Sequence, residues 1–177
     1  LFPHDRYVLR SYSPVDTIVG GEILDNLPPR HKRTDATVSD RLQVLQQADP
    51  GKALAVFCKE AGLKGLTAAQ IQSRLGLDTA RQQALVEKLL KAGQLTAFSR
   101  EPLLVADPQA IRELEQLVQQ ELKDFHAKNP LKQGMLREEL RARLPYGTSE
   151  KLFSQVIEKL VEKNNIGSSR EYLFLAG

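Results

Sequence analysis

The sequence predicts a mainly helical protein with small β-elements, in which a short β-rich segment precedes two copies of one compact unit. Near residue 36 the apolar pattern changes from a period of two to a helical period. The stretch TAAQIQSRLGLDTARQQALVEKLLKAGQL at 67–95 is then matched in pattern by LREELRARLPYGTSEKLFSQVIEKLVEKNNI at 136–166, and strand–turn–strand sequence follows each copy. Because each unit spans about 70 residues, we expect two tandem small domains rather than a solenoid.

The composition is that of an ordinary folded protein. The 177 residues are 27% charged and 41% hydrophobic, with a net charge of +3. This mildly basic balance permits a nucleic-acid partner without requiring one. The single cysteine, Cys58, excludes an internal disulfide, and within the apolar run ALAVFC it is expected to be buried. No apolar stretch approaches the roughly 20 residues of a membrane span, so we expect a cytoplasmic protein without membrane contact.

Residues 1–35 are expected to form two strands and a basic exit segment. Side chains alternate with a period of two over 7–12, and Gly20-Gly21 interrupts the chain before Leu24. Two short strands bury too little apolar surface to be stable alone, so we expect them to belong to a larger sheet or barrel. The chain opens in strand-like sequence without a methionine, which indicates a fragment of a longer protein. The exit segment is basic throughout: Arg30, His31, Lys32 and Arg33.

The first unit, residues 36–106, is expected to contain four helices and a hairpin. Thr67 and Gln70 form a capping box, in which each side chain bonds the other residue's backbone amide. Asp78 is expected to cap the fourth helix and Gly93 to end it. The expected helices are 38–48, 51–61, 67–76 and 79–92, and the expected strands are 94–98 and 103–106.

The second unit, residues 107–177, repeats the order of three helices and a hairpin, and so lacks a counterpart of the helix expected at 38–48. Asp107-Pro108 is typical of a helix start, with a cap residue followed by proline at the first helical position. A two-residue insertion lies around 145–147, and the turn 169–171 is expected to correspond to the turn 99–101. The expected helices are 107–127, 136–144 and 148–163, and the expected strands are 166–168 and 172–175.

Two helices joined by a tight turn and followed by a hairpin predict a winged-helix domain, here in tandem. The helices that open at Asp78 and Thr148 then correspond to recognition helices, and 99–102 and 169–171 to wing tips. Winged helices bind DNA, bind RNA or serve as protein spacers, so the fold leaves these classes open. The basic residues that could contact RNA are Arg30, His31, Lys32, Arg33, Arg74, Arg81, Lys88, Arg141, Arg143 and Lys151. For each one on a helix, the alternative is a solvated face with paired charges.

The front segment resembles the last strands of the third domain of bacterial selenocysteine-specific elongation factors, which is a barrel. Val19 departs from the pattern, because the family usually has a further glycine there. The family continues into tandem winged helices, as this sequence does, so the resemblance covers the whole chain. The residues that carry it are Asp5-Arg6, Val8-Leu9-Arg10, Thr17-Ile18, Gly20-Gly21, Leu24-Asp25 and the exit Pro28-Pro29-Arg30-His31-Lys32-Arg33.

The resemblance implies a fragment of a GTP-dependent factor that delivers selenocysteinyl-tRNA to the ribosome at UGA codons and recognises an mRNA hairpin. Residues 1–35 would be barrel strands and a basic linker, and 36–106 and 107–177 the first two winged helices of usually four. These two would act largely as an arm between the tRNA-carrying body and the hairpin-binding end, with direct RNA contact as an alternative. GTP and Mg²⁺ would bind the parent protein upstream of Leu1.

The chain itself carries no recognisable catalytic chemistry. It lacks the phosphate-binding pattern G-x-x-x-x-G-K-[ST], and its three histidines have no second ligand at metal spacing, so we predict neither an enzyme nor a cofactor or metal site in this fragment. Two other classes stay open. A DNA-binding regulator with paired winged helices predicts a continuous basic face, and a protein-docking module predicts an exposed apolar patch of several hundred Å². Without a heptad pattern, we expect a monomer.

Overall fold

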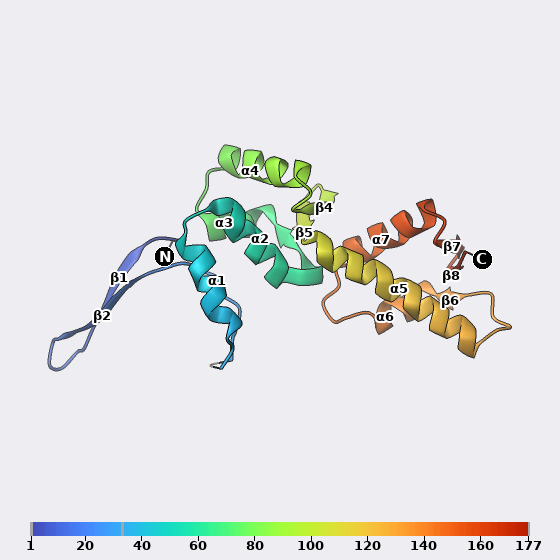
Figure 1. Ribbon diagram of the computed structural model, residues 1–177, viewed down its shortest axis with the longest axis horizontal. Helices are drawn as coiled ribbons and strands as arrows, with labels where there is room; N and C mark the ends of the chain where they lie inside the picture. The colour runs from blue at the N-terminus through green and yellow to red at the C-terminus, as the bar shows by residue number, and fades with distance from the viewer. Residues whose placement is uncertain (1, 33, 177) are drawn as a thin grey trace.

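The computed structural model describes residues 2–32 and 34–176. Figure 1 shows an elongated molecule, with a β-hairpin projecting at one end and two helical modules following in line. The predicted mainly helical fold with small sheets is confirmed. No helix in the described ranges is both long and apolar enough to span a bilayer.

The projecting hairpin consists of β1 (Arg6–Arg10) and β2 (Thr17–Glu22), paired antiparallel. Neighbouring residues of a strand point to opposite faces, and Val8 and Leu9 are both more than half exposed. The hairpin therefore presents apolar side chains on both faces, which fits the expectation that its strands belong to a larger sheet. The other exposed apolar side chains of the hairpin and its loop are Tyr12, Val15, Ile18 and Val19.

The helices of the first module begin close to their expected caps. The Asp49 and Asp78 carboxylates accept backbone amides at the starts of α2 and α4, and Thr67 and Gln70 form the capping box of α3. Gly76 ends α3 in the left-handed conformation, at a φ of +63°. The helices are α1 (Thr37–Gln46), α2 (Pro50–Ala61), the short 3₁₀ helix η1 (Gly62–Lys64), α3 (Ala68–Leu75) and α4 (Thr79–Lys91).

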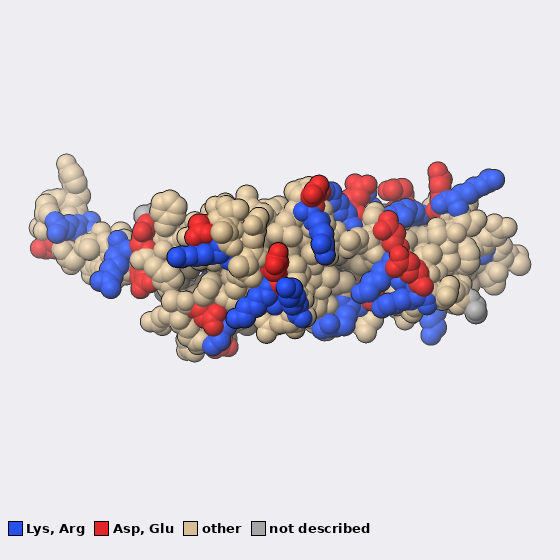
Figure 2. Space-filling model, turned by 90° about the horizontal axis from the view of Figure 1, so that it is seen from above, with Lys and Arg blue, Asp and Glu red and all other residues tan. Residues whose placement is uncertain are grey.

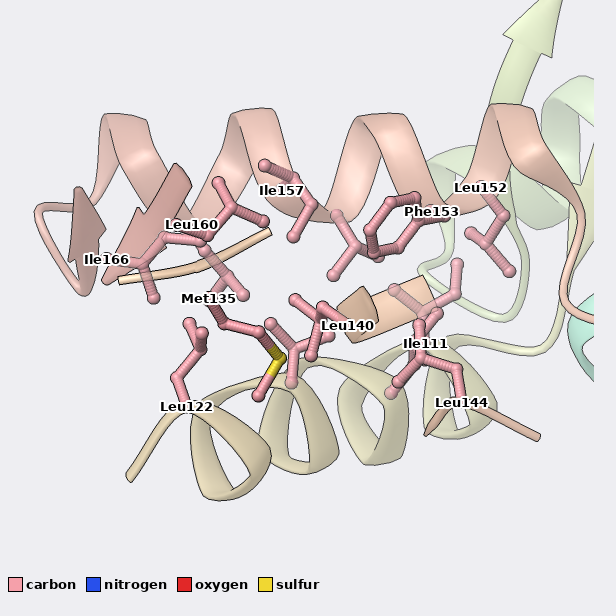
Figure 3. Packing of buried hydrophobic residues seen from close by; sticks show 14 of the residues in the cluster. Ile111, Leu122, Met135, Leu140, Leu144, Leu152, Phe153, Ile157, Leu160 and Ile166 are labelled. Atoms are coloured by element: carbon pink, nitrogen blue, oxygen red, sulfur yellow. The ribbon is translucent and has the colours of Figure 1, made fainter. Parts of the chain in front are cut away.

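The second module repeats the architecture with a longer first helix. It contains α5 (Pro108–Lys128), α6 (Arg137–Arg143) and α7 (Glu150–Glu162). The expected start of α7 at Thr148 is wrong: the Thr148 hydroxyl donates to the Pro145 carbonyl at 2.8 Å, and the helix begins at Glu150. Figure 3 shows its core, in which apolar side chains of α5, α6 and α7 interdigitate around Met135 and Leu140.

Each module carries a three-stranded antiparallel sheet, where sequence reasoning expected only a hairpin. In the first, β3 (Leu66–Thr67) pairs with β5 (Leu103–Ala106), which pairs with β4 (Thr96–Arg100). The second has the same order in β6 (Met135–Leu136), β8 (Tyr172–Leu175) and β7 (Ile166–Ser169). The third strands were missed because two residues are too few to show an alternating pattern.

The two wings differ at Phe98. Between Ala97 and Ser99 the register against β5 shifts, which places a bulge at Phe98, whereas β7 and β8 pair without interruption. The wing turns close on Arg100–Leu103 and Ser169–Tyr172. The expected correspondence of turns 99–101 and 169–171 is therefore displaced by one residue. A bulge re-aims the side chain that it carries.

The bulge places Phe98 in the core of the second module. Its side chain is 2% exposed and belongs, with Ala106, to the cluster of buried residues from α5, α6 and α7. The backbone supports this contact, because the Leu63 carbonyl accepts the Ser149 amide at 3.2 Å. The modules thus share a packed interface. Their division at residue 106 stays a prediction, since one wing contributes to both cores.

Candidate nucleic-acid interface

The exit segment places three of the predicted basic residues in solvent. Arg30, His31 and Lys32 are exposed between the hairpin and α1, and Arg33 lies outside the described residues. In the parts of the chain that the structure describes, no carboxylate lies within ion-pair distance of Arg30 or Lys32. Their charges are therefore available to a phosphate backbone.

Arg74 does not join this exposed set. Its side chain is 7% exposed, and its Nη2 lies 2.6 Å from Asp25 and 2.9 Å from Glu60. Its guanidinium also stacks over the Phe57 ring at 3.7 Å. A nucleic acid could reach it only by breaking this packing, so we correct the expectation and leave Arg74 out of the interface.

On the first recognition helix, α4, the predicted residues Arg81 and Lys88 are both exposed. Arg81 is 79% exposed and lies 3.3 Å from the Asp78 carboxylate, a pair that solvent screens. Among the described residues Lys88 has no carboxylate within ion-pair distance. Lys88 is thus the better placed of the two for a phosphate.

In the second module the predicted arginines are paired and the lysine is not. Arg141 lies 3.6 Å from Glu150. Arg143 lies 2.8 Å from Glu139 and 3.4 Å from Glu121. Lys151, at the start of α7, is exposed and forms no ion pair with any described residue. For the two arginines the paired-face alternative fits the geometry better than RNA contact.

Two basic residues that sequence reasoning missed, Lys91 and Arg100, line a groove of about 830 Å³ between α3, α4 and the first wing. Its apolar lining includes Val86, Leu90 and Leu103. A signal was available: Lys91 follows Lys88 by three residues and so lies on a neighbouring helix position, and Arg100 sits at a wing turn. They extend the exposed positive charge from α4 to the wing.

The second module fills the corresponding space with larger side chains. Aligning α4 with α7 places Phe153 at the position of Gln82, and aligning α3 with α6 places Arg137 at that of Ala68. The Arg137 guanidinium lies 5.2 Å from the centre of the Phe153 ring, and it donates to the Ser154 hydroxyl at 2.8 Å. In the first module, Gln82 is buried and only donates to the Ala68 carbonyl. The two recognition faces therefore differ in shape.

Charge on this side of the molecule is mixed. Figure 2, which looks down onto α4 and α7, shows Lys and Arg interleaved with Asp and Glu along the length of the two modules. The continuous basic face that a paired-domain DNA regulator predicts is not seen on this face. Separate basic points along an elongated body suit contact with a few phosphates better than tracking of a long duplex.

The remaining histidine, cysteine and acidic side chains gather into no metal centre in the described ranges. No group of three or more His, Cys, Asp or Glu side chains within residues 2–32 and 34–176 is placed to hold a metal ion. The His4 Nδ1 lies 2.5 Å from a Glu22 oxygen on the exposed hairpin. The Cys58 side chain is fully buried, and burial together with the charge of Asp107 raises the pKa of its thiol to about 12.

Comparison with known proteins points to one family. Residues 119–175 match the family model described as "Elongation factor SelB, winged helix". The whole factor "Selenocysteine-specific elongation factor" of Desulfomicrobium baculatum is 27% identical over 177 residues, covering 98% of this chain. The chain spans 27% of that relative's length. A solved structure of the mRNA-binding domain of elongation factor SelB from E. coli, in complex with SECIS RNA, matches 73% of this chain and 98% of its own, with 15% identity and a TM-score of 0.49.

Proposed function

We propose that this chain, which belongs to the selenocysteine-specific elongation factor family, works as the arm between the tRNA-carrying body of such a factor and its mRNA-hairpin-binding end. The match to a whole factor along 98% of this chain supports the proposal. So does the element order, with an open hairpin followed by two winged helices in line. The parent protein would bind GTP with Mg²⁺, deliver selenocysteinyl-tRNA to the ribosome at UGA codons and act in the cytoplasm.

The observation that carries this proposal is the packed junction between the modules. A spacer transmits the position of one end to the other only if its parts do not turn freely. Here Phe98 belongs to the first wing, but its side chain is buried in the core of the second module. The Ser149 amide also donates a hydrogen bond to the Leu63 carbonyl across the junction. Interfaces between domains of one chain are mobile by default unless they are large and apolar. This junction has the apolar filling that stiffness requires.

A second, narrower role is direct RNA contact by the first module. It is favoured by four exposed cations on α4, the first wing and α7, two of which, Lys91 and Arg100, line the same groove: Lys88, Lys91, Arg100 and Lys151. Because phosphate contacts release condensed counterions, such a set adds affinity without sequence preference. The arm would then hold the flank of the mRNA hairpin while other modules read its bases.

The arm proposal is tested in the complete factor. Phe98→Ala removes the ring that fills the junction, so we expect UGA decoding to fall while hairpin-RNA affinity and GTP hydrolysis stay near wild type. Tyr146→Ala, at a fully exposed position, is the matched control and should leave all three unchanged. Normal decoding by Phe98→Ala, with the junction shown to be loosened, would contradict the proposal.

A further inference from the structure

Four charged side chains meet where the hairpin segment enters the first module. The Asp25 carboxylate accepts from Arg74 Nε at 3.1 Å and from Arg74 Nη2 at 2.6 Å, and it also pairs with Arg41. Glu60 pairs with the same two arginines, at 2.9 Å from Arg74. The four charges alternate in sign around a closed ring. They come from four separate parts of the chain, namely the segment after β2, α1, α2 and α3.

Asp25 is the least replaceable member of this ring. Its side chain is 2% exposed, against 18% for Glu60. Two buried guanidiniums share its carboxylate. Without it, Arg41 and Arg74 would face each other with Glu60 as their remaining carboxylate in the described part of the chain. A buried pair that loses one partner leaves an uncompensated charge away from water, which is strongly unfavourable.

The helix that Arg41 anchors has little else to hold it. Of the ten residues of α1, only Leu45 is buried, and at its N-terminus the exposed Asp35 carboxylate accepts the Thr37 amide at 3.0 Å. A ten-residue helix is marginal without tertiary support. By contrast, α2 alone contributes Ala53, Leu54, Phe57 and Cys58 to the first core. The charge ring therefore joins one weakly packed element to a well-packed one.

The segment that carries Asp25 is likewise held at few points. The Asn26 amide donates to the Ser73 carbonyl at 3.0 Å, and Leu24 packs partly on the first core. From Leu27 to Lys32 the described residues are exposed. The orientation of the hairpin relative to the module thus depends on the short stretch 24–26, and Asp25 is the buried charge at its centre.

We propose that Asp25 is a latch that fixes the hairpin relative to the first module, and that its opening frees the hairpin root and α1 together while α2, α3, α4 and the sheet stay packed. The latch does not depend on any RNA contact. It gives the joint between the β-rich segment and the arm two discrete states, because the ring is either closed or leaves two arginines without their common partner.

The latch is tested by distance measurement in the 177-residue chain. Spin labels at Thr17→Cys on β2 and Gln83→Cys on α4 report the hairpin direction, and the buried native Cys58 stays unlabelled. We expect one narrow distance distribution in the parent and at least a twofold wider one in Asp25→Asn. The control is Glu115→Gln, which breaks the 2.6 Å pair with Lys159 in the second module and should leave the distribution narrow.

Hydrogen exchange identifies what moves. In Asp25→Asn, the amides of α1 should lose protection by about 100-fold or more, and those of α2 and α3 should change little. Arg41→Gln keeps the Asp25–Arg74 pair, so it should lower the protection of the α1 amides but leave the hairpin distance distribution narrow. This variant is the one to measure if Asp25→Asn does not fold. An unchanged α1, or equal loss of protection in α1 and α2, would show that the ring is only part of the general core and would overturn the latch.

Discussion

The Phe98 ring lies against the backbone at Gly65, so closely that a Cβ built on Gly65 would stand 2.5 Å from the ring. Gly65 itself has a φ of +69°, a conformation that side chains with a Cβ rarely adopt. The bulge in β4 and the glycine before β3 therefore act together to position the Phe98 ring. The bulge turns the ring toward the second module, and the glycine leaves room for it to pass.

Gly65→Ala should destabilise the protein more than Gly93→Ala does. Both glycines have φ near +69°, but nothing lies within 4 Å of a Cβ at Gly93. The Gly93 substitution therefore carries a conformational penalty of about 1 kcal/mol without crowding. Gly65→Ala adds crowding against the Phe98 ring and the Val105 carbonyl, and its ψ of 179° is a conformation that side chains with a Cβ rarely adopt. Urea unfolding measures both. Equal losses would show that the space at Gly65 is not restricted and would contradict this arrangement.

Phe98→Ala should lower the free energy of unfolding by about 3–5 kcal/mol, as for other buried phenylalanines. The substitution empties part of the core of the second module, although the residue belongs to the first wing. We therefore expect calorimetry to resolve two transitions where the parent shows one. Leu131→Ala, at a position that is 99% exposed, is the control and should change neither the midpoint nor the number of transitions.

Hairpin-RNA affinity should depend on the exposed lysines and not on the paired arginine. Removing one phosphate-binding lysine lowers the steepness of log K against log salt by about 1, so Lys88→Ala with Lys151→Ala should reduce this slope by about 2. Arg143→Ala, which removes a residue already paired with Glu139, should leave it near the parent value. Fluorescence anisotropy across a salt series measures the slope. Stronger binding to duplex DNA than to RNA would favour the regulator class.

Acid should weaken the latch. Burial by itself raises the pKa of Asp25, but hydrogen bonds from Arg74 and the Leu27 amide, with the charge of Arg41, outweigh it and leave the pKa below its ordinary value of 3.8. A lowered folded-state pKa means that the stabilisation is present above about pH 4 and is lost as the pH falls through the folded pKa.

Urea midpoints between pH 6 and pH 2.5 check this dependence. In Asp25→Asn the urea midpoint should fall less between pH 6 and pH 2.5 than in the parent. In Glu115→Gln it should fall as much as in the parent. The rest of the destabilisation by acid has other sources. Hydrogen bonds from Thr37 lower the pKa of Asp35, and backbone hydrogen bonds at the start of α2 lower the pKa of Asp49. An acid loss of the same size in Asp25→Asn and in the parent would refute the assignment to Asp25.

The Cys58 thiol should not react in the native protein. It is fully buried, and its pKa is raised to about 12, so almost no thiolate forms near pH 8. A thiol reagent should modify it only as fast as the first core opens, whereas Ser168→Cys, on an exposed strand position, should react at once. Because the folded pKa exceeds the unfolded one, stability should also fall as the pH rises from about 9 to 12.

Local pattern was enough to predict most of the secondary structure. The Thr67–Gln70 capping box and the Asp78 cap involve residues three apart in the chain, so their geometry follows from local backbone conformation. The repeat of helices and wings, and hence the winged-helix fold, could be predicted in the same way. Segments of two residues, such as β3 and β6, carry too little pattern and become strands only because a neighbour pairs with them.

The candidate interface could be predicted only in part. Lys88 and Lys151 are exposed as expected, because both lie on helix faces that point away from the module cores. Arg74 is also a basic residue of a predicted helix, yet it is buried, because Asp25 lies 49 positions earlier in the chain and folds back onto it. No local pattern records such a partner.

The sequence by itself determined that a β-segment is followed by two winged helices, since caps, apolar periods and turn residues act over a few positions. Only the tertiary structure decided which charges are buried, where the modules join and which way Phe98 points. Those features depend on contacts between residues far apart in the chain, such as Asp25 with Arg74 and Phe98 with the second core. Packing and desolvation set their energies, and both exist only once the chain has folded.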